Sequence, residues 1–306
     1  MFWALLSGIG ACANSLYFIA NKKFLQSIGP DILAASGFLF TSFFLLSIAV
    51  SRGIPALGPD FVFAVAATST INVAATTLIF WALKSTDISL AVPMLSFTPL
   101  FLLVTAALLL HETPSVIGFT GIIIIVTGSY ILNTAAEHTR LLDPFRSMVS
   151  HPGIFSMLIV SFLYAIAIGF DKMVVLNSDT VFGSGVVFLV IGSGFLGILL
   201  LKRRSERKRS GLSVSTPVVT AGTSYRHHRD ILVAGMAIGL IVTIEAMAIN
   251  TAYLEQIAPY VIAIKRMSIL ITVLYGTVVF HEGGIIRRIS GAGLMVCGVV
   301  LILLFP

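Results

Sequence analysis

The sequence predicts an all-α integral membrane protein whose ten transmembrane helices form two inverted repeats of five. The chain of 306 residues is 57% hydrophobic and only 10% charged, whereas a soluble domain carries roughly 25% charged residues. Ten apolar stretches are each long enough to cross a hydrocarbon core of about 30 Å as a helix. A third observation, an internal repeat, relates the second half of the chain to the first. Together these features exclude a water-soluble enzyme.

The ten expected spans occupy more than two thirds of the chain and leave no room for a separate aqueous domain. Stretches of this length are too long for the strands of an outer-membrane barrel, so they favour a helical bundle. The spans cover residues 2–20, 32–50, 60–83, 88–110, 115–133, 153–176, 180–201, 231–253, 257–280 and 285–305.

The internal repeat defines the organisation of the chain. Residues 61–133 align with 231–303 at an offset of 170, without a gap, and the earlier spans align at offsets near 150. A basic segment at 202–230, expected to be a flexible loop in the second copy, accounts for the difference. Two fused copies with an odd number of spans must enter the membrane from opposite sides, which is typical of secondary carriers with a site at the midplane. The expected units are a first repeat, an inter-repeat loop and a second repeat, at 1–133, 134–152 and 153–306.

The end of each repeat carries the same motif, an acidic residue followed by glycines nine and sixteen residues later. These are Glu112-Gly121-Gly128 and Glu282-Gly291-Gly298. In this pattern the chain resembles EamA-type members of the drug/metabolite transporter superfamily, over nearly its whole length. The resemblance implies a ten-helix basket whose third, fourth, eighth and ninth helices line a central cavity. It does not specify a substrate, because such relatives export amino acids, sugars, drugs and other metabolites.

The motif residues themselves are expected to be structural. Glycines seven residues apart lie on one helix face, where they allow close packing of helices in lipid. Glu112 and Glu282 fall at helix ends, where a carboxylate stays hydrated or caps the N-terminus of the next helix.

Three ionisable residues lie deep within expected spans. Glu245 belongs to the eighth span, and Lys265 and Arg266 to the ninth. A charge at the bilayer centre costs about 2.5–3.5 kcal/mol even on the insertion scale, so these residues need partners or water. Glu245 and Lys265 each lie ten residues from a turn near Glu255, so an antiparallel hairpin puts them at equal depth, in reach of an ion pair.

Two interpretations of this cluster are open. The pair of Glu245 with Lys265 or Arg266 could only fix the hairpin, or the cluster could be a substrate site with one spare positive charge, in which Glu245 exchanges a proton. Adjacent residues point about 100° apart on a helix, so Lys265 and Arg266 are not expected to face one cavity together.

Other polar residues at helical spacing complete the expected substrate-binding wall. Asn72 is favoured because its amide is harder to satisfy on its own backbone than a hydroxyl, whereas Asn250 is expected at a helix contact. The further candidates are Asn14, Tyr17, Tyr164, Ser69 and Thr76. Pro93 and Pro99 predict a break in the fourth helix, which either offers backbone groups to a ligand or is a packing kink.

We therefore expect a secondary active transporter with alternating access. Its substrate would be a small polar metabolite, anionic or zwitterionic, moved with protons or by exchange. The alternatives are a flippase for a lipid-linked headgroup and an intramembrane enzyme or sensor acting on a lipid phosphate. No catalytic residue, cofactor or metal is expected, because no Walker motif, catalytic triad or metal-ligand cluster is present in the sequence.

The expected partners follow from the charge distribution. Eight of the 19 basic residues lie in 202–230, so the excess positive charge indicates contact with anionic lipid headgroups and not with nucleic acid. We expect a monomer or homodimer in a bacterial cytoplasmic membrane. The distribution of Lys and Arg among the turns places both termini outside, whereas the resemblance implies cytoplasmic termini.

Overall fold

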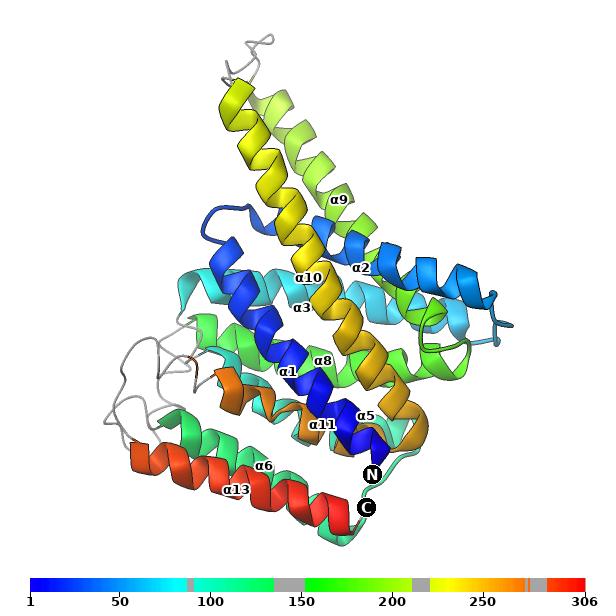
Figure 1. The fold of residues 1–306 in the computed structure, drawn as a ribbon, viewed down its shortest axis with the longest axis vertical. Coiled ribbons are helices and arrows are strands. Elements are labelled where there is room, and N and C mark those ends of the chain that lie inside the picture. Colours follow the sequence, from blue (N-terminus) through cyan, green and yellow to red (C-terminus); the bar gives the residue numbers. More distant parts are fainter. Residues whose placement is uncertain (87–90, 135–151, 211–220, 273–274, 276–284, 306) are drawn as a thin grey trace.

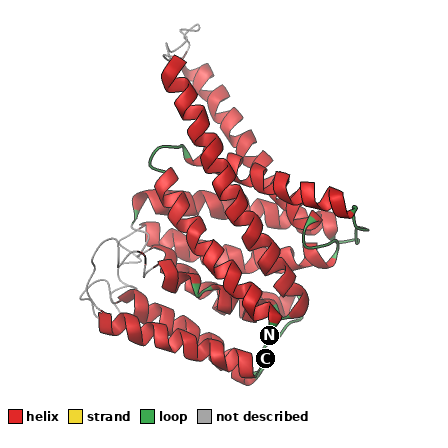
Figure 2. Ribbon diagram, in the orientation of Figure 1, coloured by secondary structure: helices red, strands yellow, loops and turns green. Residues whose placement is uncertain are grey.

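The described chain is helical throughout, apart from the connecting loops (Figure 2). A computed structural model describes residues 1–86, 91–134, 152–210, 221–272, 275 and 285–305. Its first half contains α1 (Phe2–Phe24), α2 (Pro30–Arg52), α3 (Phe61–Ser85), the 3₁₀ helix η1 (Val92–Phe97), α5 (Thr98–Leu109) and α6 (Val116–Thr134). Its second half contains α8 (Pro152–Leu176), α9 (Phe182–Ser210), α10 (Ala221–Glu255), α11 (Ala258–Lys265) and α13 (Ile285–Leu304).

Six of the described helices are long and apolar enough to cross a membrane: α1, α2, α3, α8, α9 and α10. Three shorter apolar helices lie at Met94–Leu109, Val116–Leu132 and Ile289–Leu304. Large apolar side chains also lie exposed on the outer surface, among them Phe43, Val62 and Leu108. A soluble protein does not expose so much apolar surface, so these faces fit a hydrocarbon environment.

The helices pack in pairs that are distant in sequence. α2 contacts α9, α3 contacts α8, and α10 contacts both α1 and α2. α6 and α13 form a separate pair along one side of the bundle (Figure 1). The two chain ends lie near each other at one end of this arrangement (Figure 1).

The α6–α13 pair depends on the glycines of the repeated motif. A Cβ added at Gly128 would meet the backbone O of Gly291 at 2.7 Å, and one added at Gly121 would meet the backbone O of Gly298 at 2.9 Å. The two backbones therefore approach closely only because these positions carry no side chain. This confirms the interpretation of the motif glycines as packing residues.

The prediction of a flexible loop at 202–230 is wrong for both ends of this segment, which are helical. α9 continues to Ser210 and α10 begins at Ala221, and only 211–220 lies outside the described residues. The first part of the segment, 202–209, is rich in Lys and Arg, which are strong helix formers. A helix that extends beyond the bundle needs no apolar face, so the lack of an apolar period in this segment does not indicate a loop.

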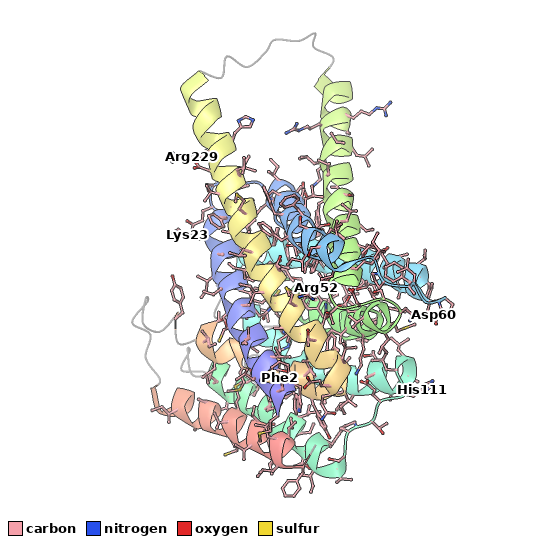
Figure 3. The ribbon with its side chains drawn as sticks, turned by 45° about the vertical axis from the view of Figure 1, so that its right-hand side comes forward. Phe2, Lys23, Arg52, Asp60, His111 and Arg229 are labelled. Carbon is pink, nitrogen blue, oxygen red and sulfur yellow. The ribbon has the colours of Figure 1, made fainter. Side chains whose placement is uncertain are left out.

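The extensions of α9 and α10 project together past the other helices (Figure 1). Figure 3 places Phe2 and Lys23 at opposite ends of α1, and Arg229 on the projecting part of α10. Lys202 pairs with Asp31 at the start of α2, with 2.6 Å between Nζ and Oδ2. The basic extensions and the turn between α1 and α2 therefore lie at the same end of the bundle.

Candidate functional site

A cavity of about 150 Å³ lies inside the bundle. Its wall is built from α1, α2, α3, α8, α9 and α10 and from the C-terminal end of α11. Apolar side chains and a set of polar and charged side chains share this wall. The polar and charged members are Asn14, Tyr17, Asn72, Thr76, Tyr164, Asp171, Ser184, Glu245, Asn250, Tyr253, Lys265 and Arg266.

An interruption in the ninth helix brings Lys265 and Arg266 into the cavity together. α11 ends at Lys265, Arg266 is its C-cap, and the chain is helical again at 268–272. At the turn, the N–H of Met267 donates to the carbonyl of Ile264, three residues earlier, at 2.9 Å. The expectation that adjacent residues could not both face the cavity is wrong because it assumed a continuous helix. The remainder of the expected span, at 273–274 and 276–280, lies outside the described residues.

The predicted ion pair between the eighth and ninth helices is present. Lys265 Nζ lies 2.6 Å from Glu245 Oε1, and the two side chains are only 17% and 13% exposed. Asn14 Nδ2 donates to the same carboxylate oxygen at 3.0 Å, and Asn14 Oδ1 accepts from Ser268 Oγ at 3.2 Å. The pair is therefore held from α1 as well as from the hairpin that the sequence predicted.

Arg266 lies in the same wall without a comparable partner. Its side chain is buried, with 3% of the residue exposed. Its Nε has no hydrogen-bond partner, and no carboxylate within the described part of the chain forms a salt bridge with it. An unsatisfied buried donor is costly, so the guanidinium is a candidate for binding a ligand in the cavity.

Asp171 on α8 is a charged cavity residue that the sequence reasoning missed. Thr68 Oγ1 donates to Asp171 Oδ1 at 2.5 Å, and Asn72 Nδ2 donates to Thr68 Oγ1 at 3.0 Å. Asp171 interacts electrostatically with Lys265, as Arg266 does with Glu245. The signal was available, because Asp171 is an ionisable residue within the expected span 153–176. Asp171 lies in the last quarter of that span, where a charge is expected near the membrane surface and not in a central site.

The remaining polar candidates divide between the cavity and helix contacts. Tyr17, Tyr164 and Thr76 line the cavity. Ser69 is not among the lining residues; its hydroxyl lies 3.4 Å from the carbonyl of Val187 on α9. Ser69 is therefore buried between α3 and α9 because this face of α3 is covered by the neighbouring helix.

Asn72 lines the cavity and Asn250 makes a helix contact, as expected, but each side chain also has a second role. Asn72 lines the cavity but also donates to the carbonyl of Thr68 at 3.0 Å, so its amide does bond back to its own helix. Asn250 contacts α9 through a 2.6 Å bond from Nδ2 to Ser184 Oγ, and it lines the cavity as well. A helix contact and a place in the cavity wall are thus compatible for one side chain.

The fourth helix changes its geometry between the two prolines. Pro93 lies in the 3₁₀ helix η1, and Pro99 lies in the first turn of α5, which begins at Thr98. Proline suits the first turn of a helix because its missing N–H has no helical partner there. Pro99 is not among the cavity-lining residues.

A second charged contact joins both halves of the chain away from the cavity wall. Lys172 Nζ lies 2.5 Å from Glu112 Oε1 and donates to the carbonyl of Gln256 at 2.8 Å. Glu112 Oε2 accepts from the backbone N–H of Ala258 at 2.8 Å, at the N-terminus of α11. Glu112 therefore caps a helix, as expected, but that helix is α11 and not the one that follows Glu112. Glu282 lies outside the described residues.

Comparisons with known proteins agree with this architecture. Residues 1–134 match the EamA-like transporter family, whereas no curated protein matches the chain. Among 26 matching chains of solved structures is one described as "Crystal structure of protein". It has a TM-score of 0.68 and 14% identity, over 99% of this chain and 96% of that chain. At this identity the likeness shows the fold alone. The match over residues 1–134 supports an EamA-type transporter of the drug/metabolite transporter superfamily, and the apolar helices support an integral, multi-pass membrane protein.

Proposed function

We propose that the chain is a secondary active transporter that binds a small polar metabolite in the central cavity and exposes it alternately on the two sides of the membrane. The observation that carries this proposal is the buried Arg266 in the wall of a cavity inside a membrane bundle: its Nε has no hydrogen-bond partner and its guanidinium no salt bridge among the described residues. Ionisable groups within the membrane mark substrate or ion pathways. We place the protein in a bacterial cytoplasmic membrane.

The proposed architecture is ten spans in two inverted five-helix repeats. The contact of Gly121 with Gly298 maps onto the contact of Gly291 with Gly128 when each residue is shifted by the repeat offset. These two contacts run in opposite directions along α6 and α13, so equivalent helices are antiparallel. An in-plane twofold axis produces this relation.

Two equivalent lysine contacts support the repeat itself. Lys22 Nζ donates to the carbonyl of Thr86 at 2.9 Å, and Lys172 Nζ donates to the carbonyl of Gln256 at 2.8 Å. Lys22 aligns with Lys172, and Thr86 with Gln256, at offsets of 150 and 170. Each lysine thus makes the same contact within its own repeat. Lys22 joins α1 to the end of α3, and Lys172 joins α8 to the end of α10.

The cavity charges suggest separate roles in transport. Arg266 would hold the negatively charged group of the substrate, because its guanidinium has no carboxylate partner among the described residues. Glu245 would couple transport to protons: protonation removes its attraction for Lys265 and frees a second cation. The titratable or charged groups that face Glu245 in this cavity are Tyr17, Tyr164, Asp171, Tyr253, Lys265 and Arg266.

Reconstitution tests the proposal. A thermal-shift screen of the purified protein against carboxylates, phosphates and zwitterions selects a solute, and proteoliposomes loaded with it should show counterflow of the labelled form. Arg266→Gln should weaken binding of that solute about 10- to 100-fold, since a hydrogen bond to a charged group contributes about 1.5–3 kcal/mol. Arg203→Gln, on the exposed part of α9, is the matched control.

The outcomes separate the candidate functions. Absence of counterflow for every selected solute, or an unchanged affinity in Arg266→Gln, would refute the transport proposal. Chemical conversion of the solute would support an intramembrane enzyme, and entry of a lipid-linked headgroup from the bilayer would support a flippase.

A further inference from the structure

The cavity wall contains four formal charges in two different states. Glu245 and Lys265 neutralise each other at 2.6 Å. Arg266 and Asp171 have no salt-bridge partner among the residues that the structure describes. The wall as a whole is therefore neutral, with one cation and one carboxylate available to a ligand.

We propose that the cavity binds a zwitterion, with its anionic group on Arg266 and its cationic group on Asp171. This inference rests on the proposed function, since it assigns the ligand class of the same transport site. It changes the expectation from the sequence, where Glu245, Lys265 and Arg266 alone left a spare positive charge that suited an anion as well.

Asp171 is held in place as a binding group would be. Its Oδ1 accepts from Thr68, which Asn72 fixes in turn from the next turn of α3, and no hydrogen bond from the described chain reaches Oδ2. A carboxylate with one oxygen anchored and the other free presents a defined acceptor to an ammonium group. Asn72 and Thr68 act here as positioning residues.

The two unpaired charges share close neighbours. Tyr164 on α8 and Tyr253 on α10 each interact electrostatically with both Asp171 and Arg266. Asp171 and Arg266 also line the same cavity of about 150 Å³, so one small molecule bound there can contact both charges. A purely anionic ligand would satisfy Arg266 but leave Asp171 as an uncompensated negative charge in a medium of low dielectric, which opposes binding.

The rest of the wall favours an apolar substituent on this zwitterion. Phe38 and Phe188 stack with their ring centroids 5.7 Å apart, and both line the cavity beside Ile191 and Val242. Pockets of this kind bind through apolar contact and use a few polar groups for orientation.

Matched ligands that lack one charge test the proposal. The first series is L-leucine, isocaproate and isoamylamine, and the second is L-phenylalanine, hydrocinnamate and phenethylamine. A third series, ε-aminocaproate, caproate and pentylamine, places the two charges further apart. Binding to the purified full-length protein is measured by thermal shift and calorimetry. In at least one series the zwitterion should bind about 10- to 100-fold more tightly than either singly charged analogue.

Variants assign the two ends of the ligand. Asp171→Asn should abolish the advantage of the zwitterion over the carboxylate analogue, whereas Arg266→Gln should abolish its advantage over the amine. Thr68→Val, which removes the hydroxyl that holds Asp171, should weaken zwitterion binding in the same direction by a smaller factor. Asp60→Asn, at an exposed position outside the cavity, should change neither preference. If Asp171→Asn elutes as an aggregate in size-exclusion chromatography, Thr68→Val supplies the test.

Each outcome decides the inference. Tighter binding of carboxylates than of zwitterions by the wild type, no binding of any zwitterion, or an unchanged preference in Asp171→Asn and Thr68→Val would overturn it. Counterflow of a carboxylate, accompanied by one proton, would overturn the zwitterion assignment while leaving the transport proposal intact. Specific binding of a zwitterion without counterflow would overturn the transport proposal and leave the zwitterion assignment intact.

Discussion

The pair of Glu245 and Lys265 offers a test of whether the charged cluster is structural or functional. Both side chains are largely buried, with 13% of Glu245 and 17% of Lys265 exposed, and Lys265 Nζ lies 2.6 Å from Glu245 Oε1. Removing one partner of a buried pair leaves an uncompensated charge and costs about 3–5 kcal/mol. Glu245→Gln and Lys265→Met should therefore each reduce the free energy of unfolding by about 3 kcal/mol. The loss of stability in Glu245→Gln should be the smaller of the two, because Asn14 can still donate a hydrogen bond to the Gln oxygen.

The double variant should recover much of this loss, because replacing both charges of a buried pair is often close to neutral. We expect a coupling free energy of about 2 kcal/mol or more from the double-mutant cycle. The assay is denaturant or thermal unfolding of the purified protein in one detergent, with Lys23→Met, at an exposed position in the last turn of α1, as a control for loss of a lysine. Additive losses would refute the assumption that these two charges neutralise each other in the folded protein.

Transport by the same double variant separates the two interpretations. A stable double variant with normal counterflow shows that the pair only fixes the hairpin. A stable double variant that has lost both transport and its pH dependence shows that the charges act on the substrate or on a proton.

Two further changes test the packing around the site. Gly128→Ala should lower the free energy of unfolding by about 1–3 kcal/mol, because its Cβ would meet backbone atoms of α13 at 2.7–2.8 Å. Gly197→Ala is the control and should be tolerated, since no atom lies within 4 Å of the added Cβ. Equal thermal stability of the two variants would contradict the close approach of α6 and α13. Glu112→Gln should lower stability through loss of its ion pair with Lys172, and Glu112→Ala should lower it further by about 0.5–2 kcal/mol through loss of the cap on Ala258. Thermal unfolding ranks the three proteins, and a Gln variant as stable as the wild type would show that this ion pair contributes nothing.

Much of the candidate site could be found from the sequence because depth in a membrane follows from distance along a helix. Glu245 and Lys265 are equally far from their turn, and this predicted a pair of Glu245 with Lys265 or Arg266, of which the structure has the first. The spans followed from hydropathy, and the packing role of Gly121 and Gly128 followed from their spacing and from the cost of separating helices in lipid.

Other features had no local signal. Neither proline nor glycine occurs at 264–268, yet α11 ends at Lys265 and allows Arg266 into the cavity. Asp171 lies in the last quarter of its span, where a charge is expected near the membrane surface, but packing of α8 against α3 places it beside Thr68 in the cavity wall.

The sequence by itself determined that the chain is a helical membrane bundle, and it predicted a repeated unit and an equal depth for the two partners of its main charged pair. These properties depend on hydrophobicity and on spacing along single helices, which the order of residues contains directly. Only the tertiary structure decided which cavity charges have no salt-bridge partner in the part of the chain that the structure describes. That outcome depends on which helices become neighbours, as α1 does with α10 and α3 with α8, and such contacts join residues more than a hundred positions apart.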